Sequence, residues 1–275
     1  MTSILTPKLR IIIGMVLLRL STLSLGLFAG GTALGAGGPG AKFINYYQIL
    51  LSKLGVEGHA ADEWIPVIGG FVSLAIITTI GLIYSSAMKN ADISPPGRFS
   101  IAGIVDALLS FVQNLTSSIL GEKPAATFLP LLASLFIFIL ISNLTGLVPG
   151  FIPATESINT NVAMALSVFV VYNIAGIKEH GGSYVKQFIG PVAFLAPLMV
   201  VIELIAHLAR PMSLSLRLYG NIFGDHLVLS VFTGLTYLIL PAFLLFFGLL
   251  VASLQSFVFT LLSSIYIALA ISHDH

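Results

Sequence analysis

An apolar run from Phe188 to Phe232 limits the folds open to this chain more than any other stretch. A perpendicular membrane span needs only about 20 residues, so a run of this length either breaks or crosses a bilayer at a strong tilt. Three prolines interrupt it, at Pro191, Pro197 and Pro211. A second long run, Leu235 to Ile271, follows directly. Together the two runs predict a pair of overlong, tilted helices that could curve around a cylindrical partner in the membrane.

The composition agrees with a membrane protein of several spans. Hydrophobic residues make up 57% of the chain and charged residues only 8%, which is incompatible with an ordinary soluble surface. The formal charge is +1 and no basic run stands out, so we expect no nucleic-acid partner. The chain has no cysteine, which excludes disulfides, thiolate metal sites and cysteine nucleophiles.

The first residues resemble a secretory signal peptide. Basic residues precede an apolar run from Ile11 to Phe28, and small residues follow it. We expect cleavage near Ala33–Ala36, so that residues 1–36 form the signal and 37–275 the membrane domain. The alternative is a retained first membrane helix, and Arg19 counts against both interpretations.

Four shorter stretches have the length and composition of membrane spans or of a surface helix. The expected spans are Pro66–Met88, Phe128–Val148 and Val162–Ile177, which with the two long runs makes about five. Phe99–Leu120 is amphipathic and is expected to lie on the cytoplasmic surface. Gly37–Trp64 reads as a polar outer segment with one short amphipathic turn around Tyr46–Leu54. The predicted fold is therefore an all-α polytopic membrane protein.

The lysines and arginines predict the orientation of these spans. Lys89 and Arg98 follow the first expected span, and Lys178 and Lys186 follow the third, whereas the loop from Pro149 to Thr160 contains neither type. By the positive-inside rule the lysine-bearing ends face the cytoplasm. The mature N-terminus is then outside and the C-terminus inside.

Six polar residues lie in the longest run where a membrane helix should be apolar. At about 100° per residue they fall within roughly ±40° of one line along a helix. They are Glu203, His207, Arg210, Arg217, Asn221 and Asp225. Charge inside a membrane is costly and usually functional, so this polar stripe predicts a path for an ion.

Arg217 is the most informative member of the stripe. A guanidinium stays protonated, so Arg217 can hold a nearby carboxylate ionised but cannot readily relay protons. Glu203, His207, Asp225 and His226 can each bind and release a proton where water reaches them, and Asn221 can hydrogen-bond that water. The alternative is a set of satisfied ion pairs, for example Glu203 with His207 or Arg210 at helical spacing.

The last helix carries a face of small and polar residues at helical spacing. These are Gly248, Ala252, Gln255, Phe259, Ser263 and Tyr266. Small residues permit close helix approach, and Gln255 is expected to hydrogen-bond the helix of Arg217. For Ser263 and Tyr266, ordinary packing is the competing interpretation. No metal-ligand spacing, phosphate loop or nucleophile–base set occurs, so we expect no cofactor, metal or nucleotide.

The segment Ser213-Leu214-Ser215-Leu216-Arg217-Leu218-Tyr219-Gly220-Asn221 resembles the signature of subunit a of F-type ATP synthases. Further segments are similar to that family at the expected places. They are Pro96-Gly97-Arg98-Phe99, Ser142-Asn143-Leu144 with Pro149, and Leu254-Gln255-Ser256-Phe257 with Tyr266. The resemblance covers all but about the first sixty residues.

This resemblance implies a non-catalytic stator subunit that couples ion flow to rotation of a c-subunit ring and so to ATP synthesis. It implies that two offset half-channels meet the ring carboxylates on either side of Arg217, with Asn221 and Gln255 beside it. It also implies that Glu203 lies toward the cytoplasmic half-channel and His226 in the outer one. The implied partners are the c-ring, the b subunits of the peripheral stalk and the rest of the complex, in a bacterial inner membrane.

One departure from the family pattern concerns the acid of the outer half-channel. Many relatives carry His or Glu seven residues before the glutamine, where this chain has Gly248. The plastid and cyanobacterial branch is similar in pairing that glycine with an Asp at the position of Asp225. We therefore expect Asp225 to supply the missing acid.

Two other function classes remain open from the sequence. A self-contained channel or transporter would conduct when purified alone, whereas a stator needs its ring. A structural scaffold with buried ion pairs would keep its activity when the stripe residues are neutralised. The sequence does not choose between proton and sodium coupling.

Overall fold

The computed structural model describes residues 45–55, 59–89, 100–148, 150–181, 196–235 and 239–272. All regular elements in these ranges are helical, as predicted. Six helices there are long and apolar enough to cross a membrane, as expected for the five spans together with the amphipathic helix. The expected signal peptide lies outside the described residues.

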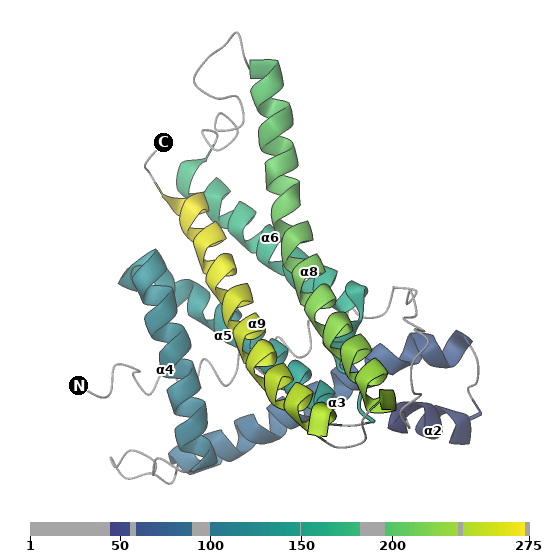
Figure 1. Ribbon diagram of the computed structural model, residues 1–275. Coiled ribbons are helices and arrows are strands. Elements are labelled where there is room, and N and C mark those ends of the chain that lie inside the picture. Colours follow the sequence, from purple (N-terminus) through teal and green to yellow (C-terminus); the bar gives the residue numbers. More distant parts are fainter. Residues whose placement is uncertain are drawn as a thin grey trace.

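The elements follow one another in a simple order (Figure 1). The short helix α2 is followed by the long helix α3, by α4 and α5, by the 3₁₀ turn η1 and α6, and finally by α8 and α9. Their bounds are α2 Tyr46–Lys53, α3 His59–Lys89, α4 Ile101–Leu120, α5 Glu122–Gly146, η1 Ala154–Glu156, α6 Ile158–His180, α8 Ala196–Leu235 and α9 Ile239–Ile271.

The two overlong helices of the sequence are present, and α8 is continuous. It contains 40 residues with Pro211 inside it, so the alternative of a break at Pro211 is wrong. At about 1.5 Å per residue, α8 is roughly 60 Å long, twice the hydrocarbon thickness of about 30 Å. The 33 residues of α9 begin two residues before Pro241, where the missing N–H of proline costs no helical hydrogen bond.

Two helix starts differ from the expectation. α3 begins at His59, within the segment expected to be a polar outer loop. α5 begins at Glu122, whereas its apolar span was expected only from Phe128. Gly121 with φ 80° separates α4 from α5, and Glu122 and Pro124 are both well suited to a first helical turn. Polar first turns therefore extend helices that hydropathy alone would begin later.

Helices α5, α6, α8 and α9 enclose the main hydrophobic core. All four helices contribute fully buried side chains, among them Leu132, Val168, Leu218 and Phe259. α4 packs against α5 and α9 through its own buried face, which includes Leu109 and Val112. α4 also runs across the direction of α3 (Figure 1), as expected if one spans the bilayer and the other lies along it.

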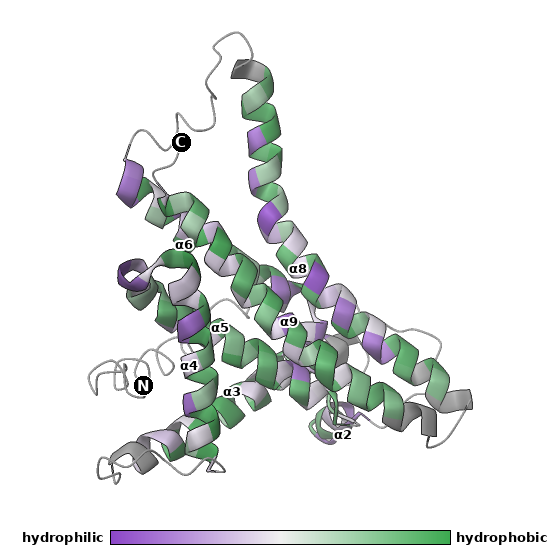
Figure 2. Ribbon diagram, turned by 60° about the vertical axis from the view of Figure 1, so that its left-hand side comes forward, coloured by the Kyte–Doolittle hydropathy of each residue, from purple (hydrophilic) through white to green (hydrophobic). Residues whose placement is uncertain are grey.

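Polar residues recur along α8 between apolar turns, as Figure 2 shows by the purple bands on a mostly green helix. The buried side of α8 carries Leu214, Ser215, Leu218 and Ile222. The opposite side is exposed. The stripe residues lie along the border between these two sides, and they alternate between half-buried, buried and exposed positions.

Candidate functional site: a polar line along helix α8

Arg217 lies on the exposed side of this border. Its side chain is exposed, and Nη2 donates a long hydrogen bond of 3.5 Å to Ser213 Oγ. Apolar side chains surround that face, with Met212 60% and Leu216 51% exposed. Within the described residues, no carboxylate forms an ion pair with Arg217. The guanidinium is thus presented to whatever covers this face.

Asn221 and Gln255 join α8 to α9 one turn beyond Arg217. Asn221 Nδ2 donates to Gln255 Oε1 at 2.6 Å. Gln255 is only 4% exposed, so its amide would be costly to leave unpaired. The predicted hydrogen bond between Gln255 and the Arg217 helix is confirmed.

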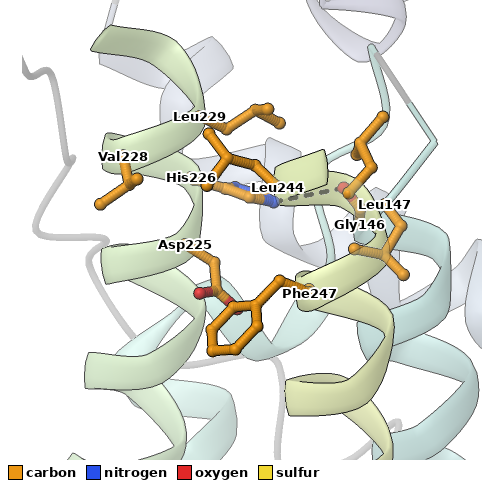
Figure 3. A pocket seen from close by; sticks show the side chains of 10 residues that line it. Gly146, Leu147, Asp225, His226, Val228, Leu229, Leu244 and Phe247 are labelled. Atoms are coloured by element: carbon orange, nitrogen blue, oxygen red, sulfur yellow. Dashed lines mark hydrogen bonds between the residues drawn. The ribbon is translucent and has the colours of Figure 1, made fainter. Parts of the chain in front are cut away.

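Toward η1, a cavity of about 160 Å³ opens between α8 and α9. Asp225 and His226 of α8 line it together with Gly248 of α9 and Leu147 just past α5. Figure 3 shows the Asp225 carboxylate on the cavity wall beside Phe247, with His226 one residue further along. Asp225 and Gly248, the two positions that the family resemblance links, thus line the same cavity.

His226 uses both ring nitrogens. Nε2 donates to the carbonyl oxygen of Gly146 at 3.3 Å, the dashed line in Figure 3. Nδ1 lies 2.9 Å from Glu156 Oε2. A lone pair facing a carboxylate would be repelled at this distance, so one proton occupies the Nδ1–Oε2 contact, either as imidazolium with carboxylate or as imidazole with carboxylic acid.

Glu156 is the functional candidate that the sequence interpretation missed. It was read only as an acidic residue of an outer loop, since it is 70 positions from His226. The sequence carried no local signal for it, because an acidic residue in an outer loop is ordinary. Only the fold places that loop against α8.

The loop that carries Glu156 is built rigidly onto α3 and α5. The Glu156 N–H donates to the Pro153 carbonyl at 3.1 Å, closing the 3₁₀ turn. At Gly69 of α3, an added Cβ would come within 2.7 Å of the Ile152 carbonyl oxygen, and at Gly146 of α5 it would come within 2.7 Å of the Pro153 ring. Both glycines therefore permit the close approach of this loop.

Helix α2 covers the same loop from its other side. The Tyr46 N–H donates to the Gly150 carbonyl at 3.1 Å. Tyr47 is buried and meets Phe151 edge-on with ring centroids 5.7 Å apart. Burial raises the pKa of the Tyr47 phenol, so this ring stays neutral and acts by packing. The short turn expected around Tyr46–Leu54 thus supports the loop of Glu156.

A buried polar cluster adjoins the same loop. Thr155 Oγ1 donates to Asn143 Oδ1 at 2.7 Å, and Asn161 Nδ2 donates to the Thr155 carbonyl at 2.8 Å. The remaining amide atoms, Asn143 Nδ2 and Asn161 Oδ1, are buried without a protein partner. A donor and an acceptor left unpaired next to one residue are typical of sites for buried water.

At the other end of the stripe, the described residues do not show the ion pairs that were the alternative interpretation of Glu203, His207 and Arg210. Within the described residues, no ion pair or hydrogen bond joins Glu203 to His207 or Arg210. His207 instead turns toward α6, where its Nε2 lies 2.9 Å from Asn173 Oδ1. Asn173 Nδ2 already donates to the Phe169 carbonyl, so His207 Nε2 is the donor in this contact.

Aromatic rings surround His207 and Arg210. The ring of His207 packs edge-on against Phe169 and Tyr172, with centroids 5.0 and 5.2 Å away. The Arg210 guanidinium carbon lies 5.7 Å from the centre of the Tyr266 ring, within the range of a cation–π interaction. Glu203 remains half-buried at the border. Helical spacing alone missed Tyr172 and Asn173, because both lie on α6.

The predicted small and polar face of α9 is buried against its neighbours. Ala252, Gln255, Phe259 and Ser263 are each less than 5% exposed. Ser263 Oγ donates to the Phe259 carbonyl at 2.7 Å, which satisfies the hydroxyl within its own helix. For Ser263 and Tyr266 the packing interpretation is therefore the one that the contacts support.

Comparison with known proteins agrees with this geometry. The family model described as ATP synthase A chain matches residues 68–268. An ATP synthase subunit a of Bdellovibrio bacteriovorus is 46% identical over 67% of this chain and 81% of its own length. ATP synthase subunit a 2 of Syntrophotalea carbinolica is 43% identical over 82% and 91%, respectively. The corresponding subunit of Citrifermentans bemidjiense is 42% identical over 85% and 97%. This chain belongs to the ATP synthase subunit a family.

Proposed function

We propose that this subunit conducts protons as the stationary partner of a rotating c-subunit ring. Two aqueous paths from opposite sides meet the ring carboxylates on either side of Arg217. The supporting observation is the exposed guanidinium among apolar side chains, within a candidate span of 32 residues. A permanent cation at such a position requires a counter-charge, and none comes from the described residues of this chain. A carboxylate on the ring supplies one.

The chemistry follows from the charge. A ring carboxylate facing lipid is stable only when protonated, because burying an ion is costly. Beside Arg217 the ionised form is favoured, so the proton leaves as the carboxylate arrives. A carboxylate that has passed Arg217 must be reprotonated from the other path before it re-enters the lipid. Net proton flow therefore requires rotation, which is how this non-catalytic subunit couples transport to ATP synthesis.

The titratable residues lie on both sides of Arg217. Asp225 and His226 lie toward η1, whose loop has no lysine or arginine, and Glu203 lies toward the end at which α6 terminates with Lys178. The positive-inside rule then gives an outer path beside Asp225 and an inner path beside Glu203, with the C-terminus in the cytoplasm. The peripheral-stalk b subunits hold this subunit against the torque, in a bacterial inner membrane.

The proton is the proposed ion, rather than sodium, because the outer cavity is lined by an imidazole and a carboxylate. Imidazole exchanges protons near neutral pH but is not a ligand suited to a hard cation. ATP synthesis driven by an imposed pH difference in sodium-free buffer tests this choice. Sodium-dependent synthesis would contradict it.

The experiment that tests the coupling role uses Arg217→Ala in the assembled complex. In inverted vesicles, ATP-driven acidification should be abolished while assembly is largely retained, and Arg217→Lys should be severely impaired because an ammonium can lose its proton when desolvated. Arg210→Gln is the matched control, since this arginine packs on Tyr266 and its loss should leave most pumping intact. Near-normal pumping by Arg217→Ala would contradict the proposal.

A further inference from the structure

Glu156 of η1 lies against His226, near the end of α8 that faces η1. It joins two residues 70 positions apart, and its carboxylate and imidazole are only 18% and 25% exposed. We infer that Glu156 is a proton-carrying residue of the outer path, forming with His226 a single gate that loads the cavity beside Asp225. This inference rests on the proposed function.

The hydrogen bonds of His226 determine where protons are exchanged. Nε2–H is held by the Gly146 carbonyl oxygen, and a peptide carbonyl cannot carry the proton further. Exchange is therefore confined to Nδ1 and the Glu156 carboxylate. Protons that pass His226 must pass Glu156 too, as long as the ring keeps this orientation. The two side chains then act as one proton-carrying unit.

Other groups around the gate are consistent with this assignment. Among the described residues that line the cavity, Asp225 is the only other titratable one. α9 contributes Leu244, Leu245, Phe247 and Gly248, and the end of α5 contributes Gly146 and Leu147. The cavity is large enough for several waters and has polar groups to bind them. Asp225 is thus the nearest acceptor for a proton released into the cavity.

A second observation, two buried unpaired amide atoms beside Thr155, suits a water-binding site next to Glu156. Asn143 Nδ2 and Asn161 Oδ1 are buried and have no hydrogen-bond partner. The other polar atom of each side-chain amide is hydrogen-bonded to Thr155, the residue before Glu156. A bound water would satisfy both atoms. This polar cluster joins α5, η1 and α6 at the residue that precedes Glu156.

The transfer can be written with its protons balanced. The resting pair holds one proton, as imidazolium and carboxylate. Water from the outer side protonates the free oxygen of Glu156, which gives the pair a net positive charge. The N–H bond at Nδ1 then breaks as cavity water takes that proton and passes it to the Asp225 carboxylate. The Glu156 carboxyl group then rotates so that its protonated oxygen faces Nδ1 and donates the proton there, which returns the pair to its starting state.

The test measures passive proton flux from the lumen of inverted vesicles after removal of the soluble sector, as a function of lumenal pH. The variants are Glu156→Gln, His226→Gln and the double variant, with Glu122→Gln as control because Glu122 is an exposed acid at the start of α5. We expect Glu156→Gln to lower the flux about tenfold, the scale of losing one positioned proton carrier with water as a substitute.

Three experimental outcomes distinguish a proton-carrying role of Glu156 from a purely structural one. Glu156→Gln should change the lumenal pH of half-maximal flux, whereas structural damage lowers the flux equally at every pH. The double variant should be no slower than the slower single variant, since the pair acts as a unit. Glu156→Asp should recover part of the flux. Wild-type flux and pH profile in an assembled Glu156→Gln complex would overturn the gate, while Arg217 would still decide the coupling mechanism independently.

Discussion

The polar stripe of α8 passes through two different environments, one on each side of Arg217. Toward η1, Asp225 and His226 line a cavity, and His226 Nδ1 lies 2.9 Å from Glu156 Oε2. Toward the start of α8, His207 and Arg210 pack against aromatic rings of α6 and α9. The first environment can exchange protons with water, whereas the second fixes helices in place.

This difference teaches that polar residues on one helical line need not share a function. The spacing that places His207 and Asp225 within one stripe says nothing of the neighbouring helices. His207 meets an asparagine that is itself fixed by a backbone carbonyl. Asp225 meets a cavity because its neighbour on α9 is Gly248. The neighbour, rather than the spacing, decides which groups can titrate usefully.

Of the substitutions within the two regions beside Arg217, the largest loss of proton transport is expected at Asp225. Asp225→Asn removes the one carboxylate found among the described lining residues of the cavity, so proton-driven ATP synthesis in inverted vesicles should fall by about tenfold or more. Adding Gly248→Glu should restore part of it, because the new acid enters the same cavity. Its Cβ would approach Leu147 Cδ2 to 2.9 Å, and that flexible side-chain end can move. Unchanged synthesis in Asp225→Asn would show that the outer path does not use this acid.

A smaller loss is expected when the outer loop is displaced without touching a titratable group. Gly69→Ala pushes a methyl group against the backbone of Ile152 and should move the turn that presents Glu156. Gly81→Ala on the same helix meets nothing within 4 Å and serves as the control. Proton flux through the membrane sector should fall severalfold only in Gly69→Ala. Equal flux in the two variants would mean that the loop position is not critical.

The smallest effect on transport is expected at the aromatic end. Tyr266→Leu removes the cation–π partner of Arg210 and should destabilise the subunit by about 1 kcal/mol. Tyr266→Phe keeps the ring and should be nearly neutral. Thermal dissociation of the complex measures stability, while proton flux from the vesicle lumen measures transport. A loss of proton flux in Tyr266→Leu without a loss of stability would contradict the distinction between the two regions.

The sequence predicts most of the helices and the polar stripe that contains Arg217, because hydropathy and spacing are local properties. It also predicts the link between Gln255 and the Arg217 helix, since that link needs only two adjacent antiparallel helices. It does not predict Glu156 at His226 or Asn173 at His207, because these contacts depend on how η1 and α6 fold back against α8. The alternative of ion pairs at Glu203 is not seen in the described residues, where His207 and Arg210 instead contact side chains of α6 and α9.

The central claim is that two separate aqueous paths end on either side of Arg217. The chain has no cysteine, so single cysteines can be introduced and labelled with a membrane-impermeant thiol reagent in right-side-out and inverted vesicles. Leu229→Cys lies in the cavity lining and should react only from the outer side. Glu203→Cys should react only from the inner side, and Leu216→Cys, beneath the ring, from neither. Reaction of the Leu229 and Glu203 variants from the same side would contradict the account.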